Sequence, residues 1–179
     1  QTSSTDVLSY QDRVATGGML GPRIYSTGPG VFIDENIRDS AHAMSVLKRY
    51  SQYYGTQTLK MYMSGNRQQR QWIIQAAREQ EMLVVPEGGS TWQLNMSMVT
   101  DGHTGIEHAI PLAPMYRDVL TFMGRSRAAY TPTLIVGYGG IWGENYWYQH
   151  SEVWKNERLL HFVPRNVVDP RSTSRTQQG

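Results

Sequence analysis

The stretch TLKMYMSGNRQQRQWIIQAAREQEMLVVPEGG, residues 58–89, contains two short apolar runs on either side of a longer amphipathic one. The runs at 58–63 and 82–89 have the length of buried strands, and the second reaches a proline and two glycines. The segment between them, 66–80, repeats apolar residues at helical spacing along one face. A strand, a helix and a strand in this order predict a right-handed βαβ unit with parallel strands.

The alternation of strand and helix continues on both sides of this unit. Further strands are predicted at 22–28, 104–110 and 130–140, and further helices at 40–55, 91–102 and 113–127. Successive strands begin 21 to 36 residues apart, a spacing typical of parallel βα repeats. Two closures fit this pattern, an open doubly wound sheet and part of a (β/α)8 barrel. A complete barrel needs about 250 residues, so this chain of 179 residues holds roughly five of the eight units.

Composition excludes several classes of protein. The formal net charge is only +2, and the 17 basic residues are spread along the chain without the clustered patch that nucleic-acid binding requires. No apolar stretch approaches the roughly 20 residues of a membrane-spanning helix. The chain has no cysteine, which excludes disulfides and thiolate metal sites. We therefore predict no nucleic-acid partner and no membrane span.

The predicted boundaries follow from the same patterns. Residues 1–20 form an N-terminal segment of undefined structure, residues 21–165 hold the βα repeats, and residues 166–179 form a flexible tail rich in Arg, Gln and Ser. The opening QTSSTD has neither an initiator methionine nor a signal-like run, which is typical of a processed chain or of a piece of a longer one.

Polar side chains recur where the predicted strands end. These positions are Ser26, Lys60 with Tyr62, Glu87, His108, and Thr131 with Thr133. In both parallel architectures the chemistry gathers at the carboxyl ends of the strands. The pattern therefore predicts a functional centre formed by several strand ends together.

Lys60 lies within a short apolar strand. Strand alternation places Leu59 and Met61 on one face and Lys60 and Tyr62 on the other, so Lys60 points inward if that second face lines a barrel. Desolvation favours the uncharged form of a buried lysine, an amine that attacks carbonyl compounds or carbon dioxide. The alternative interpretation is an edge-strand lysine that faces water.

Glu87 and His108 are the other two candidates for chemistry. His108 can bind a divalent metal or act as an acid or base, and Glu87 can supply an oxygen ligand or a general base. The alternatives are a hydrogen-bonded core histidine and a solvated loop carboxylate. Glu107 alternates with His108, so we expect it to face the opposite side in a structural role. His103 precedes the strand in a turn and is expected to be exposed.

A glycine- and aromatic-rich loop, residues 137–154, follows the last predicted strand. Loops of this composition are common on catalytic faces, because glycine permits movement and Trp and Tyr form walls with polar tips. The alternative is a surface loop that packs its own aromatic side chains. The predicted substrate-binding residues are Tyr62, Thr133, Tyr138, Trp142 and Tyr146.

Five segments together resemble the amidohydrolase superfamily: GPRIYSTG, TLKMYMSGNRQQRQWIIQAAREQ, VVPEGG, DGHTGIEHAIP and YTPTLIVGYGGIWGENYWY. The resemblance is strongest to the imidazolonepropionase-like and prolidase-like branch, which includes bacterial proteins with such a domain after a TolB-like β-propeller. It covers roughly residues 20–170. It implies the α/β class, and within it a partial TIM-type (β/α)8 barrel containing strands three to seven, with one or two divalent metal ions, usually zinc.

By motif, the resemblance places Lys60 on the carboxylated lysine of the family's fourth strand and His108 on the histidine of its sixth. Glu87 falls where the histidine of the fifth strand is expected, which is a departure. The sequence has no His-x-His pair and no recognisable eighth strand with its aspartate. Lys60, Glu87 and His108 are therefore the expected catalytic and metal-binding residues, in an incomplete site.

The resemblance implies a metal-dependent hydrolase that cleaves amide, cyclic amide, peptide or ester bonds through a metal-activated water. The alternative is a truncated amidohydrolase fragment with no native metal chemistry, or with weak promiscuous hydrolysis only. Such a fragment would associate with another copy or with a complementary barrel fragment, because an open parallel sheet exposes its edges. The resemblance favours a bacterial source and a periplasmic or secreted location, although no signal in the sequence defines the location.

Overall fold

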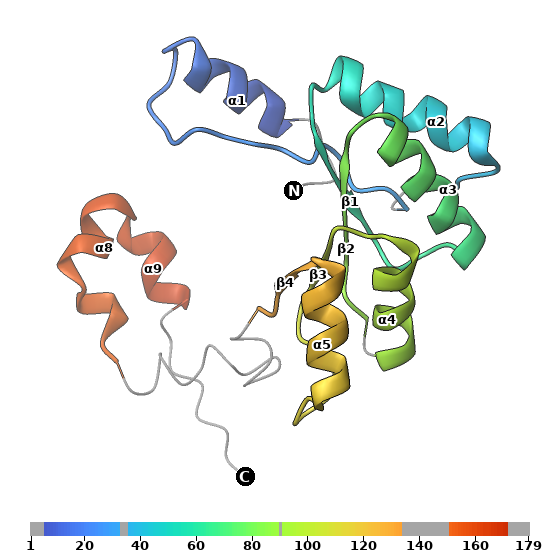
Figure 1. Cartoon of the computed structure of the whole chain (residues 1–179). Helices are drawn as coiled ribbons and strands as arrows, with labels where there is room; N and C mark the ends of the chain where they lie inside the picture. Colours follow the sequence, from blue (N-terminus) through green and yellow to red (C-terminus); the bar gives the residue numbers. More distant parts are fainter. Residues whose placement is uncertain (1–5, 33–35, 90, 134–150, 172–179) are drawn as a thin grey trace. The chain divides into compact units, whose positions relative to one another are not determined.

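A computed structural model of the chain describes residues 6–32, 36–89, 91–133 and 151–171. The chain divides into two compact units, Gln1–Pro132 and Thr133–Gly179 (Figure 1). The described part of the second unit contains three short helices, η3 (Val153–Lys155), α8 (Glu157–Phe162) and α9 (Arg165–Arg171). Helix α9 therefore extends into the segment that the sequence predicts to be a flexible tail. The candidate site lies in the first unit.

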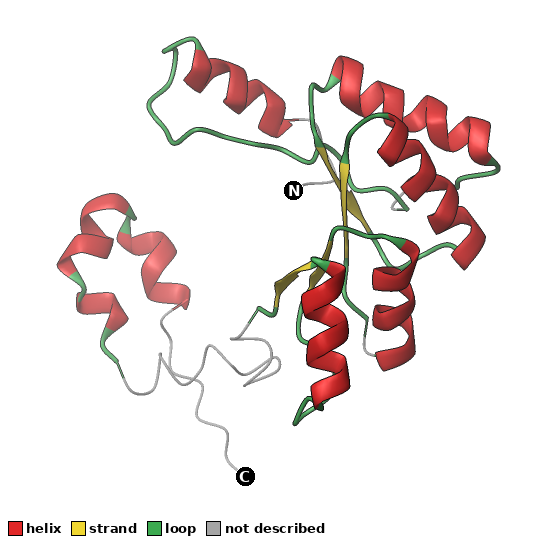
Figure 2. Ribbon diagram, viewed as in Figure 1, coloured by secondary structure: helices red, strands yellow, loops and turns green. Residues whose placement is uncertain are grey.

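The first unit belongs to the α/β class, as the sequence predicts. Strand β1 (Thr58–Met61) pairs in parallel with β2 (Leu83–Pro86), and β3 (Gly105–Glu107) pairs in parallel with β4 (Ala129–Thr131). A helix lies between each pair of consecutive strands along the chain (Figure 2). The predicted strand–helix–strand unit at 58–89 is confirmed.

Apart from the first helix, the described helices of the first unit match the predicted ranges closely. They are α1 (Asp6–Ala15), α2 (Ser40–Lys48), which continues into the π-helix η1 (Arg49–Tyr53), α3 (Arg67–Glu79), α4 (Trp92–Asp101) and α5 (Arg117–Ser126). Helix α3 begins at a capping box: Gln69 N donates to Asn66 Oδ1 at 2.9 Å, and Asn66 N donates to Gln69 Oε1 at 2.8 Å. Helix α1 lies within the first 20 residues, where the sequence alone indicates no structure.

The strand predicted at 22–28 is wrong. Ser26 Oγ accepts a hydrogen bond from Gly28 N at 2.9 Å, and Gly28 has a φ of 65°, so the chain turns where the strand was expected. The pairing with β1 comes from Val31 instead, which forms a single parallel bridge to Met61. The strand predicted at 130–140 is observed only over β4, which ends at Thr131; residues 134–140 lie outside the described part of the chain.

The core lies between the strands and the helices. Strand alternation directs Leu59, Met61, Val84 and Ile106 into it, and each is at most 1% exposed. Other fully buried apolar side chains come from the helices and the segment before α2, namely Ile37, Leu47, Ile73 and Met98. The opposite face of β1 therefore carries Lys60. In the described part of the chain, no helix has the length and apolar character needed to cross a membrane.

Hydrogen bonding between β2 and β3 is interrupted at Pro86. Leu83 N donates to the Gln57 carbonyl just before β1 at 2.8 Å, and Glu87 N donates to the Met61 carbonyl in β1 at 2.7 Å. The alternate positions of β2, Val84 and Pro86, therefore face β3. At one of these, the Val84 carbonyl accepts from Thr104 N at 3.0 Å. At the other, Pro86 has no N–H to donate. The missing donor explains why the four strands form two separate two-stranded ladders.

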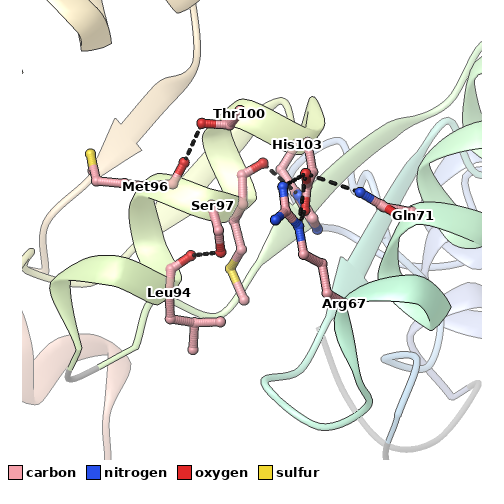
Figure 3. A network of polar contacts seen from close by, with 9 residues as sticks. Arg67, Gln71, Leu94, Met96, Ser97, Thr100 and His103 are labelled. Carbon is pink, nitrogen blue, oxygen red and sulfur yellow. Dashed lines mark hydrogen bonds and ion pairs between the residues drawn. The ribbon is translucent and has the colours of Figure 1, made fainter.

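Polar side chains join α3 to α4 (Figure 3). The Arg67 guanidinium donates to the two carboxylate oxygens of Asp101, with the shortest contacts at 2.6 and 2.9 Å, and Gln71 Nε2 adds a further hydrogen bond at 3.2 Å. The hydrogen bonds from Arg67 lower the pKa of Asp101 below its ordinary value, more than burial raises it. The carboxylate therefore stays ionised and ties the two helices together.

His103 is buried, 3% exposed, and the prediction that it is exposed is wrong. Gly102, with a φ of 100°, ends α4 in a left-handed turn that folds the next residue back against the helix. His103 Nδ1 lies 2.9 Å from the Met98 carbonyl oxygen, and Nε2 lies 3.5 Å from the Met61 sulfur. Burial lowers the pKa of His103 to about 4, so the imidazole is neutral in the folded protein near pH 7.

We expect the free energy of unfolding to fall as the pH drops from 6.5 to about 4. In this window His103 takes up a proton in the unfolded chain but not in the folded one. Above the window both states are neutral, and below it both are charged. The loss should reach about 3 kcal/mol. Urea unfolding at several pH values measures it: His103→Gln should flatten the dependence, the exposed His161→Gln should not, and equal slopes in all three proteins would contradict this prediction.

Candidate functional site

Three consecutive strands bring together the three residues selected from the sequence. Lys60 lies in β1, Glu87 directly follows β2, and His108 directly follows β3. Lys60 Nζ lies 2.7 Å from Glu87 Oε2, and His108 Nε2 forms a close hydrogen bond with Glu87 Oε1. Glu87 therefore bridges an amine and an imidazole, and the expected convergence of these side chains is present. Their role in catalysis stays a prediction.

The three side chains become more exposed along this series. Lys60 is 11% exposed, Glu87 27% and His108 38%, so the site runs from the interior to the surface. The interpretation of Lys60 as a water-facing edge lysine is wrong, because β1 has Val31 on one side and β2 on the other. Burial and pairing also set Glu87 apart from an ordinary solvated loop carboxylate.

The electrostatics of the site centre on Glu87. Burial alone would raise the pKa of Glu87, but hydrogen bonds from Lys60 and His108, together with their charge, outweigh it and lower the pKa below its ordinary value. The carboxylate is therefore ionised at neutral pH. An ionised, partly buried carboxylate with an accessible neighbouring imidazole can accept a proton or bind a divalent cation.

A left-handed backbone turn orients His108. Its φ is 68°, and its N–H donates to the Thr131 carbonyl in β4 at 2.8 Å. Strand β3 ends at Glu107, so strand alternation does not determine the direction of the His108 side chain. A non-glycine residue in this conformation costs of order 1 kcal/mol, and such residues cluster at functional sites.

The loop that carries Glu87 is held by Asn95 of α4, which is fully buried. Asn95 Oδ1 accepts from Gly89 N at 2.8 Å, and Nδ2 donates to the Gly89 carbonyl at 2.8 Å. A second bond from Nδ2 reaches the Thr91 carbonyl at 3.2 Å. Sequence reasoning missed this residue; the available signal was an amide on the face of a predicted helix that must turn inward.

Asn95→Ala should lower the free energy of unfolding by about 2–3 kcal/mol, because it leaves both polar groups of Gly89 without partners in a buried position. The same change should loosen Glu87. Ser97→Ala is the matched control in α4: its hydroxyl bonds to the Leu94 carbonyl of its own helix at 2.8 Å, and its loss should cost less than about 0.5 kcal/mol. Chemical denaturation of both variants tests this, and similar losses would contradict the assigned role of Asn95.

The predicted substrate-binding residues have different outcomes. Tyr62 is half-buried beside the site, with its ring centre 5.8 Å from Lys60 Nζ. Thr133 belongs to the second unit. Tyr138, Trp142 and Tyr146 lie outside the described residues. Of the other strand-end residues, Thr131 contributes through its backbone carbonyl to His108, and Ser26 stabilises the turn that replaces the predicted first strand.

Glu87 and His108 can supply two ligands to a divalent cation. Among the residues that the structure describes, no three His, Cys, Asp or Glu side chains gather as a ready-made metal site. The nearest third group is Lys60, whose ammonium form would repel a cation. Carboxylation turns that amine into an oxygen donor and brings the set to three, the number that catalytic zinc sites need. The donor set fits a divalent metal on that condition.

No family model, no curated protein and no solved structure matches this chain.

Proposed function

We propose that this chain is part of a metal-dependent hydrolase that cleaves amide, cyclic amide, peptide or ester bonds, and that Lys60, Glu87 and His108 form one side of its active site. The observation that carries the proposal is the bridge that Glu87 makes between Lys60 and His108 at the ends of three consecutive strands. The resemblance of the sequence segments to the amidohydrolase superfamily supports it independently.

The partial (β/α)8 barrel is part of the same proposal. Val31, β1 and β2 are neighbours in chain order, Thr104 bonds to β2 just before β3 begins, and β4 follows β3. Parallel strands that follow one another in this order are typical of barrels. Doubly wound sheets reverse the strand order at a switch point instead. The order of the described strands therefore favours the barrel interpretation.

Three side chains of this chain have separate roles in the proposed reaction. A divalent cation would be held by carboxylated Lys60, Glu87 and His108. In the amidohydrolase superfamily, which the sequence resembles, this ion is usually zinc. When bound, such an ion supplies Lewis acidity, which polarises a carbonyl and makes water a stronger nucleophile near neutral pH. Glu87, which lies between Lys60 and His108, would give one carboxylate oxygen to the cation and leave the other to accept the proton that the attacking water loses. His108 Nε2, which contacts the same carboxylate in this structure, would be a ligand, so Glu87 itself would pass that proton on to the leaving group.

Metal content and hydrolysis, measured on one purified sample, test this function. The panel should contain a chromogenic amide, peptides ending in proline, a cyclic amide and an aryl ester, each with and without a chelator. We expect activity that depends on bound metal and is lost in Lys60→Ala and His108→Ala. Lys48→Ala, an exposed lysine of α2, is the matched control and should retain activity. A metal-free protein whose weak hydrolysis survives both site variants would overturn the proposal.

A second function is favoured by a different observation. Leu83, which alternates with Val84 away from the helices, is 52% exposed, and all three residues of β4 are exposed. The face that carries Leu83 and the exposed residues of β4 would be covered in a complete barrel. A fragment without native metal chemistry could use it to associate with another copy or with a complementary barrel piece. Sedimentation analysis distinguishes the two: a concentration-dependent oligomer without bound metal would favour the association role.

A further inference from the structure

The tripeptide Pro86-Glu87-Gly88 lies where the ladder between β2 and β3 is interrupted. Pro86 occupies a position that faces β3 but has no N–H to donate there. Gly88 packs against the backbone of Glu107, the residue before His108. A Cβ at Gly88 would lie 1.8 Å from the Glu107 carbonyl oxygen and 3.0 Å from its carbonyl carbon. Both are backbone atoms, so no flexible side chain can move aside.

We propose that Pro86 and Gly88 are positioning residues that aim Glu87 across this interruption. Pro86 keeps the end of β2 out of a regular ladder and fixes the backbone φ just before Glu87. Gly88 then allows the chain to approach β3 more closely than any residue with a side chain could. As a result, one Glu87 oxygen reaches Lys60 in β1 and the other reaches His108 after β3.

This inference deepens the proposed function, and its catalytic meaning rests on that function. The placement of Glu87 can be measured without metal or substrate. The chain has three lysines, at positions 48, 60 and 155. Lys60 is buried and paired with Glu87, whereas Lys48 is exposed and Lys155, paired with Glu152, has a side chain that is 64% exposed. The rate of amine acylation at each lysine, followed by mass spectrometry, therefore reports on Glu87 at Lys60, with two internal standards.

The first variant to test is Gly88→Ala. We expect Lys60 to be acylated roughly tenfold faster than in the native protein, with Lys48 and Lys155 unchanged, because the displaced Glu87 no longer pairs with it. Gly105→Ala is the matched control, since its Cβ would meet nothing closer than 3.5 Å. Glu87→Gln defines the rate without the ion pair, and the double variant Glu87→Gln with Gly88→Ala should be no faster.

A second variant keeps the proposal testable if Gly88→Ala does not fold. Pro86→Ala introduces no clash, and we expect it to raise the Lys60 rate about threefold, because the backbone before Glu87 is no longer fixed. Folding of each variant is checked by circular dichroism. Native Lys60 rates in the variants that fold would overturn the proposal. Absence of bound metal and of hydrolysis would instead count against the proposed function, and would leave this result unaffected.

Discussion

Glu87→Gln should reduce hydrolysis by about a hundredfold or more, whereas Glu107→Gln should change it less than about threefold. Glu87 follows β2 and Glu107 ends β3, so the two glutamates lie at the ends of consecutive strands, but their surroundings differ. Glu87 contacts both Lys60 and His108, while Glu107 contributes its backbone carbonyl to the close contact with Gly88. Glutamine keeps the size of the side chain but removes its charge and its ability to accept a proton.

The same substitution should also affect stability. Lys60 would lose the carboxylate that compensates its charge in a site where it is 11% exposed. Because Glu87 itself is partly exposed, we expect a loss of about 1–2 kcal/mol in the free energy of unfolding, less than the loss for a fully buried pair. Steady-state kinetics on the panel and urea unfolding of both variants give the two measurements. Equal losses of activity in Glu87→Gln and Glu107→Gln would contradict the assignment of Glu87 to the centre of the site.

The fold of the central region is predictable because its two patterns differ in length and period. Two short apolar runs around a 13-residue amphipathic helix leave few alternatives to a βαβ unit. The direction of Lys60 is predictable for a related reason, because strand alternation places it on the face opposite Leu59 and Met61. Its burial depends on the neighbours of β1, which the pattern does not determine. The convergence of Lys60 and Glu87 then follows from parallel pairing, which aligns the carboxyl ends of β1 and β2.

The remaining features depend on backbone conformations that single residues determine. The sequence selects His108 as a candidate, but the left-handed turn that orients it has no periodic signal. His103 was placed wrongly because the turn at Gly102 reverses the chain and buries the next residue. The first strand was misplaced because the turn at Ser26 and Gly28 stops it and leaves Val31 to pair with β1. Pattern reasoning finds elements whose residues repeat, and it does not find such isolated turns.

Zinc and bicarbonate together should stabilise the folded chain. A ligand that binds only the folded state adds about 2.7 kcal/mol to the free energy of unfolding at a concentration one hundred times its Kd. Both additions are needed because the third ligand is the carboxylated form of Lys60. Glu87 and its lysine partner would otherwise remain an ion pair, and only Glu87 and His108 would be left to hold the metal. We therefore expect a weaker effect from zinc alone and none from bicarbonate alone.

Matched variants separate a specific site from general metal binding. Lys60→Ala and His108→Ala should lose most of the stabilisation, while Lys48→Ala and His161→Gln, at exposed positions elsewhere, should keep it. Urea unfolding at fixed pH across a zinc series, with and without bicarbonate, measures the shift. Equal stabilisation of Lys60→Ala and the native protein would show that zinc binds without the lysine. Because this measurement needs no substrate, it tests the metal site even if the bond that the protein cleaves is absent from the assay panel.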